Sequence, residues 1–132
     1  MPKFFAIVTA MITLCLAFMP QAKSEEAVKG DNVKRPAILE NVKRILFYGD
    51  SLTDGSSYPD YVVNSLNAAF PGANFEMENS AKCGDRVGNL LERFDADVAA
   101  KKPDLVFICI TTNDCWQKYA PEKTKAEFLE LV

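Results

Sequence analysis

Short apolar runs alternate along this chain with segments whose apolar residues recur at helical spacing. The clearest runs are 45–48 and 105–110, preceded by charged residues or proline, and a weaker run covers 74–77. Continuous apolar runs of this length are typical of strands that are buried on both faces of a parallel sheet. No other feature of the sequence limits the choice of fold as strongly.

The segments between these runs have the apolar periodicity of helices. It is present in 61–70, which ends at Pro71, and again in 87–98, which ends before Pro103. A further helix is expected to start at Pro121. The order strand, helix, strand, helix, strand predicts an α/β fold of the flavodoxin-like type, a three-layer αβα parallel sheet.

The N-terminus has the features of a secretory signal peptide. In 4–19 only two residues are not apolar, and the polar stretch 20–26 follows. This apolar run is shorter than the ~20 residues that span a bilayer. Small residues predict cleavage after Ser24, with cleavage after Ala22 or an uncleaved anchor as alternatives. We therefore expect a secreted or periplasmic protein with no stable membrane span after the leader, 1–24, is removed.

Composition limits the partners that the rest of the chain can have. Residues 25–43 are mostly polar and are expected to form a linker, which leaves 44–132 as the folded domain. The full chain has 15 basic and 18 acidic side chains, a net charge of -3, so no nucleic-acid partner is expected. It has 0 histidines, which excludes histidine-ligated metals and any imidazole base from within this chain. We expect neither a metal nor a cofactor.

Three polar segments follow the three predicted strands, and these are where a site is expected. They are the first segment, 49–55, the second segment, 79–85, and the third segment, 111–114. Ligands of doubly wound sheets bind beyond the carboxyl ends of the strands. Each segment alone would also fit a turn or a helix cap.

Taken together, the three segments resemble the sequence blocks of the SGNH (GDSL) hydrolase family over roughly 44–116. The resemblance implies that Ser51 is the nucleophile. Asp50, which precedes it, is expected to support the loop by accepting hydrogen bonds from backbone N–H groups. It also implies an oxyanion hole formed by the N–H groups of Ser51 and Gly84 and the side-chain amide of Asn113. Several fixed donors aimed at one developing oxyanion are what a tetrahedral acyl intermediate requires.

The activity implied by this resemblance is that of a secreted serine ester hydrolase with an acyl-enzyme on Ser51. The favoured substrate is an acetylated carbohydrate or another small ester, since no long apolar lid segment is evident. A lysophospholipase or thioesterase remains an alternative. A binding module without the catalytic base is another.

Two departures from the family pattern carry expectations of their own. The third block usually has glycine where this chain has Thr111, so the backbone there must accept a side chain. The family's later Asp-x-x-His block, which supplies the base and its orienting carboxylate, has no counterpart here. We therefore expect a C-terminally truncated SGNH domain that is inactive as it stands.

The remaining candidates have two interpretations each. Trp116 and Tyr58 would line the substrate site or cover the end of the sheet as core residues. Cys83 and Cys115 follow neighbouring strands and would form a disulfide or remain free thiols.

Overall fold

The computed structural model of this chain describes residues 34–132, so the expected leader and the start of the expected linker lie outside the described residues. Strands β1 (Arg44–Gly49), β2 (Glu76–Asn79) and β3 (Leu105–Cys109) form one sheet in the order β2-β1-β3. Both pairings are parallel. The predicted parallel sheet is confirmed.

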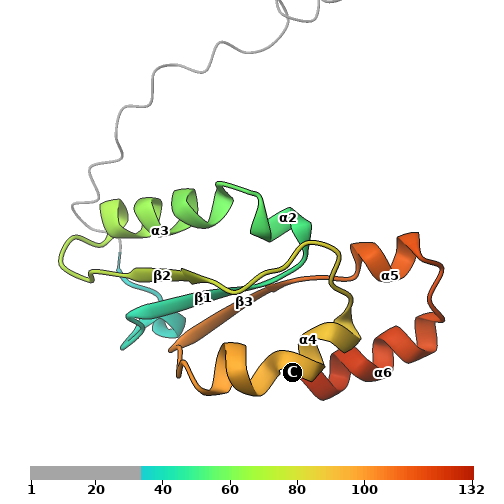
Figure 1. The fold of residues 1–132 in the computed structure, drawn as a ribbon. Helices are drawn as coiled ribbons and strands as arrows, with labels where there is room; N and C mark the ends of the chain where they lie inside the picture. Colours follow the sequence, from blue (N-terminus) through green and yellow to red (C-terminus); the bar gives the residue numbers. More distant parts are fainter. Residues whose placement is uncertain (1–33) are drawn as a thin grey trace, which may run out of the picture.

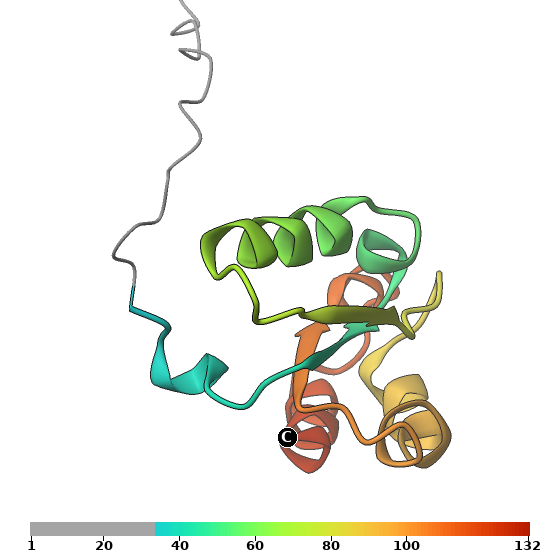
Figure 2. The same cartoon turned by 90° about the vertical axis from the view of Figure 1, so that its left-hand side faces the viewer.

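Helices cover both faces of this sheet, as predicted (Figure 1). Helix α3 (Tyr58–Ala69) lies on one face, and α4 (Val87–Phe94) and α6 (Pro121–Leu131) lie on the other; Figure 2 shows the same layers from the side. Helix α4 continues as the π-helix η2 (Asp95–Ala99), where the sequence predicts one uninterrupted helix. No helix within 34–132 is long and apolar enough to cross a bilayer.

Two short helices were not predicted as such, and both follow strands directly. Helix α2 (Ser51–Asp54) comes after β1, and α5 (Thr112–Trp116) comes after β3. Each occupies one of the polar segments, so these segments are compact helical turns rather than extended loops.

Strand β1 explains why the domain has three layers. Ile45 and Phe47 belong to the apolar cluster beneath α3, whereas Leu46 and Tyr48 belong to the cluster beneath α4 and α6. None of these four side chains is more than 1% exposed. Because successive side chains of a strand point to opposite faces, an unbroken apolar run supplies both clusters at once.

Strand β2 begins two residues later than the sequence predicts, at Glu76 instead of Asn74. Asn74 has a positive φ of 53°, which belongs to a turn. The backbone of Phe75 is hydrogen-bonded at both its N–H and its carbonyl to the side chain of Asn67 on α3. Regular pairing with β1 therefore starts only after Phe75.

The last part of the expected linker is packed against the domain. The 3-10 helix η1 (Ala37–Leu39) precedes β1, and Leu39 and Val42 are buried in the cluster beneath α3. Arg35 donates to the carbonyl of Val42 at 2.7 Å. The folded part thus begins before residue 44, because Leu39 and Val42 of this mostly polar stretch pack into the core.

Candidate active site

The three polar segments lie together at the carboxyl end of the sheet and are joined by hydrogen bonds. In the second segment, the N–H of Lys82 donates to the carbonyl of Gly49 at 2.9 Å, and the N–H of Cys83 donates to Asp54 Oδ2 at 2.9 Å. The side-chain amide of Asn113 donates to the carbonyl of Asp85 at 2.8 Å. The second segment therefore holds the first and the third in place.

The first segment is organised by Asp50, the N-cap of α2. Its Oδ1 accepts the N–H of Leu52 at 3.0 Å, the usual arrangement of an aspartate N-cap. Ser51 is the first residue of the helix and is exposed, and its own N–H has no acceptor among residues 34–132. The helix thus presents a serine hydroxyl and an unpaired backbone donor at one position.

Asp50 itself is 0% exposed, and its Oδ2 accepts no hydrogen bond from any described residue. A buried carboxylate oxygen without a donor is costly. Oδ1 of Asp50 therefore holds the loop in place, and Oδ2 is free to accept a further hydrogen bond.

The second segment turns at Gly84, which has a φ of +85°. The N–H of Asp85 closes this turn on the carbonyl of Lys82 at 3.2 Å. Glycine adopts such left-handed geometry without the strain that a Cβ brings. No described residue accepts the N–H of Gly84, so this turn presents a second free backbone donor.

The third segment begins with a residue in a conformation that favours glycine. Thr111 has a φ of +96° at the N-cap of α5, which is strained for a β-branched residue. As expected from the sequence, the backbone here carries a side chain where glycine would fit better, and it does so in a strained conformation.

Asn113, two residues after Thr111, contributes the third free donor. Its side-chain amide has two N–H bonds, and Asp85 takes one of them. The other remains available for a substrate. With the N–H groups of Ser51 and Gly84, the site therefore has three donors without a partner among the described residues, the kind of group that an oxyanion hole uses.

Asp114 is a structural residue of the site that the sequence analysis does not single out. It is 1% exposed and lies on α5 beside Asn113. Its Oδ2 accepts the N–H of Val87 at the start of α4 at 3.3 Å, and its Oδ1 accepts the hydroxyl of Thr124 on α6 at 3.3 Å. One buried carboxylate therefore ties three helices together. Its position directly after Asn113, a candidate site residue, is the only sequence signal for it.

Tyr48, in β1, has no capacity to act as a base. Burial raises the pKa of Tyr48 to about 12, against the opposing charge of Arg93. Its hydroxyl stays protonated and donates to the carbonyl of Leu90 at 2.7 Å.

The two aromatic candidates have different surroundings. Tyr58 is half-buried: its ring packs edge-on against Phe47, and its hydroxyl is 2.9 Å from Thr53 Oγ1. Trp116 is 85% exposed at the end of α5. Of the two, Trp116 is the more exposed.

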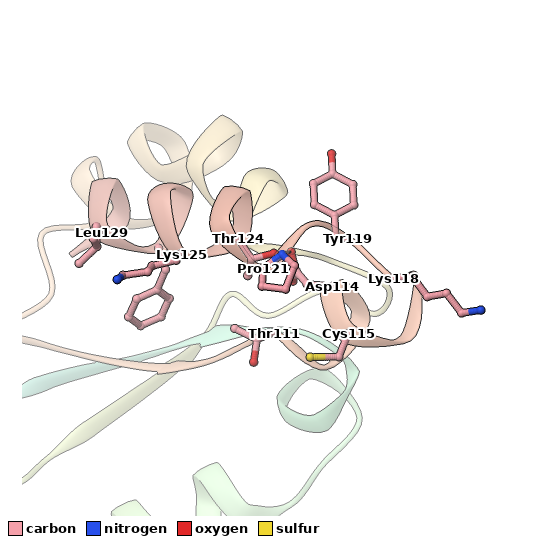
Figure 3. Close-up of a pocket in the computed structure, with 10 residues that line it drawn as sticks. Thr111, Asp114, Cys115, Lys118, Tyr119, Pro121, Thr124, Lys125 and Leu129 are labelled. Atoms are coloured by element: carbon pink, nitrogen blue, oxygen red, sulfur yellow. Dashed lines mark hydrogen bonds between the residues drawn. The ribbon is translucent and has the colours of Figure 1, made fainter.

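The disulfide considered between Cys83 and Cys115 is absent, and both residues are exposed free thiols. The N–H of Cys83 is held by Asp54 on α2. Cys115 instead lines a pocket beside α6 (Figure 3). The expectation that they follow neighbouring strands is wrong, because β1 lies between β2 and β3.

This pocket has a volume of about 670 Å³ and lies between the third segment, α5 and α6. Figure 3 shows Thr111 and Cys115 on its side nearest the sheet, and the Tyr119 ring and the Lys118 amine pointing away from it. Neither Ser51 nor Gly84 contributes to its lining. The pocket is therefore a neighbour of the three donors, not the space in front of them.

Comparison with known proteins identifies the family. Residues 47–132, well over half of the chain, match the GDSL-like lipase/acylhydrolase family. The chain belongs to this family. The resemblance noted from the three polar segments is thereby confirmed, as is the α/β fold.

Relatives of this GDSL-like chain include an acetylxylan esterase from Geobacillus stearothermophilus, which is 36% identical over 58% of this chain and 42% of its own length. A solved catalytic mutant of an acetylxylan esterase from that organism is 30% identical, with a TM-score of 0.62 over 68% of this chain. An α/β hydrolase enzyme from the metagenome of Lake Arreo, Spain, is 26% identical, with a TM-score of 0.63 over 68% of this chain.

The chain is shorter than these relatives. It spans 52% of the solved esterase mutant and 53% of the Lake Arreo hydrolase, about half of each.

Proposed function

We propose that the protein carrying this GDSL-like chain is a serine ester hydrolase that forms an acyl-enzyme on Ser51. The observation that carries the proposal is the set of unpaired N–H donors on Ser51, Gly84 and Asn113, in segments bonded to one another. Donors that are fixed before the reaction stabilise a developing oxyanion without reorganising. Family membership gives independent support.

In the proposed reaction, Ser51 Oγ attacks the ester carbonyl carbon and gives up its proton to a base. The carbonyl π electrons move to the oxygen, which accepts hydrogen bonds from the three donors. Collapse of this intermediate expels the alcohol, which takes up a proton, and leaves the acyl group on Ser51. Water then attacks the acyl-enzyme, releases the acid and restores the serine.

The base in this reaction is not assigned to a residue of this chain, which has 0 histidines. Catalytic mutants of the Geobacillus stearothermophilus acetylxylan esterase replace a serine, an aspartate or a histidine, with the aspartate three positions before the histidine. Ordinary carboxylates are weak bases for a hydroxyl. Residues 25–132 expressed alone are therefore expected to hydrolyse esters only very slowly.

We propose an acetylated carbohydrate as the substrate class. The support is the acetylxylan esterase relative, at 36% identity. Within the described part of the chain the donor segments are polar and short, which suits a small acyl group better than a long apolar one.

We also propose that residues 1–24 direct export to the periplasm or the medium. Their apolar run and the small residues at 22 and 24 support this. N-terminal sequencing of exported protein should read from residue 25, or from residue 23 if cleavage follows Ala22. A mature protein that retains Met1 would contradict the proposal.

Hydrolysis of esters by the purified natural gene product tests the function. We expect release of acetate from acetylated xylo-oligosaccharides to be faster than hydrolysis of a long-chain ester. Activity should be lost in Ser51→Ala and retained in Ser57→Ala, because Ser57 is an exposed serine whose side chain makes no capping bond. Faster turnover of the long-chain ester would favour a lipase or lysophospholipase.

A non-catalytic binding module is the alternative that the lack of histidine favours. Such a protein would bind an acetylated oligosaccharide without releasing acetate, and Ser51→Ala would leave binding intact. Measuring binding and acetate release on the same sample separates the two functions.

A further inference from the structure

Arg93 connects strand β1, which leads into Ser51, to the segment that carries Gly84. Its side chain is 14% exposed and projects from α4. The guanidinium lies 4.5 Å from the ring centre of Tyr48, three residues before Ser51 in the chain. Arg93 Nη1 also donates to the carbonyl of Ser80, in the second segment, at 2.7 Å.

The strongest contact of Arg93 with the second segment is to the carboxylate of Asp85. Arg93 Nε donates to Asp85 Oδ2 at 2.8 Å, and Nη2 lies 2.7 Å from the same oxygen. Both side chains are largely withdrawn from water, at 14% and 16% exposure. Such a pair constrains geometry more than an exposed ion pair, because solvent screens it less.

Asp85 is also the residue that holds the third segment. Its backbone carbonyl accepts the side-chain amide of Asn113 at 2.8 Å. Its N–H closes the turn at Gly84 on the carbonyl of Lys82. The position of Asp85 therefore sets the direction of the free N–H of Asn113 and the orientation of the Gly84 peptide.

We propose that Arg93 is a positioning residue: it fixes Asp85 so that the donors of Gly84 and Asn113 stay aimed at one point in front of Ser51. This inference rests on the proposed function. Arg93 touches no substrate and acts only through Asp85. Misplacing a donor by about 1 Å can cost about 100-fold in rate, so a rigid support has a kinetic role.

The structure supplies a matched control for this proposal. Arg93 also pairs with Asp97, four residues later on its own helical segment. Asp97 makes no hydrogen bond to the third segment, and its side chain reaches the second segment only through Lys82, whose side chain is 60% exposed, at 3.6 Å. Asp85→Asn and Asp97→Asn therefore each remove one carboxylate partner of Arg93, but only the first loosens the oxyanion donors.

Kinetics of the natural gene product test the proposal with an acetate ester as the substrate. We expect Arg93→Lys and Asp85→Asn to lower kcat by roughly 10-fold to 100-fold with KM changed less than about twofold. Asp97→Asn should keep the wild-type kcat. In an Asn113→Ala background, Asp85→Asn should lower kcat by less than it does alone, because only the Gly84 peptide is then left for Asp85 to hold.

Equal losses in Asp85→Asn and Asp97→Asn would overturn the proposal, since the pairs would then act only on stability. An Asp85→Asn effect of full size in the Asn113→Ala background would also overturn it. Thermal unfolding of each variant shows whether the fold is kept, and Asp85→Asn remains a test if Arg93→Lys does not fold.

A readout without catalysis separates this inference from the proposed function. The two side-chain amide protons of Asn113 give NMR signals that report its bond to Asp85. We expect those signals to shift or broaden in Arg93→Lys and Asp85→Asn and to stay in place in Asp97→Asn. Unchanged Asn113 signals in all three variants would contradict the positioning role. A protein with no esterase activity but with the expected NMR changes would contradict only the proposed function.

Discussion

Asn113 and Asp85, 28 residues apart in the chain, are joined by a 2.8 Å hydrogen bond from the side-chain amide of Asn113 to the backbone carbonyl of Asp85. This bond uses one of the two N–H groups of the amide and fixes the plane of the other. The free donor of the third segment is therefore aimed by the second segment, not by its own helix.

Asn113→Ala should lower kcat by about 100-fold to 1,000-fold with a small change in KM, because it removes a donor that acts on the transition state. The measurement is steady-state hydrolysis of an acetate ester by the natural gene product. Asn64→Ala, on the exposed side of α3, should leave kcat unchanged. Equal activity of Asn113→Ala and wild type would remove Asn113 from the oxyanion hole.

Thr111→Gly should raise the free energy of unfolding by about 1 kcal/mol, because it relieves strain at a φ of +96° that outweighs the greater freedom of glycine in the unfolded chain. Urea denaturation measures the change. The matched variant Thr112→Gly changes the first residue of α5, which has no positive φ, and should instead lower stability by roughly 0.5 kcal/mol. The same sign for both variants would argue against strain at Thr111.

Much of this architecture could be predicted from the sequence, because it follows from local patterns. The run at 45–48 is apolar at every position, and the strand that it predicts is the one buried on both faces. The order of strands and helices then fixes the layers. The polar segments could be placed at the carboxyl end of the sheet for the same reason.

The details that were missed depend on contacts between distant residues. The start of β2 is set by Asn67, whose side chain is hydrogen-bonded to the backbone N–H and carbonyl of Phe75 and so keeps them from pairing with β1. The sequence left open whether Cys83 and Cys115 pair, because the order of the strands, with β1 between β2 and β3, is not encoded by spacing along the chain. The burial of Leu39 and Val42 likewise depends on tertiary packing, which the mostly polar composition of 25–43 does not predict.

Gly49→Ala should destabilise the protein by about 2 kcal/mol, because a Cβ at this position would lie 2.1 Å from the carbonyl oxygen of Cys109 and force β1 and β3 apart. Thermal or urea unfolding measures the loss. Gly55→Ala is the control, since its Cβ would meet only the carbonyl oxygen of Ser51, at 3.9 Å. A loss in Gly55→Ala as large as that in Gly49→Ala would contradict this close approach.

Asp97 should contribute stability that disappears in acid. Burial alone would raise the pKa of Asp97, but the hydrogen bond and charge of Arg93 outweigh it and hold the pKa below the ordinary value of 3.8. A carboxylate with a lowered pKa in the folded state stabilises the fold above 3.8, and this contribution is lost as the pH falls through the lower folded value.

Asp97→Asn should therefore be less stable than wild type at pH 7, and the difference should shrink as the pH falls below about 4. Urea denaturation of both proteins across this range measures it, and comparing the two cancels the titration of the other carboxylates. A difference that does not vary with pH would show that the charge of Asp97 adds nothing to stability.

The central claim, that Ser51 is the nucleophile of this protein, is tested most directly by covalent labelling. The natural gene product is treated with a fluorophosphonate, which modifies activated serines, and the labelled peptide is identified by mass spectrometry. We predict one phosphonylated peptide that contains Ser51, no label in Ser51→Ala, and wild-type labelling in Ser57→Ala. Label on a different residue, or no label on a folded wild-type protein, would contradict the claim.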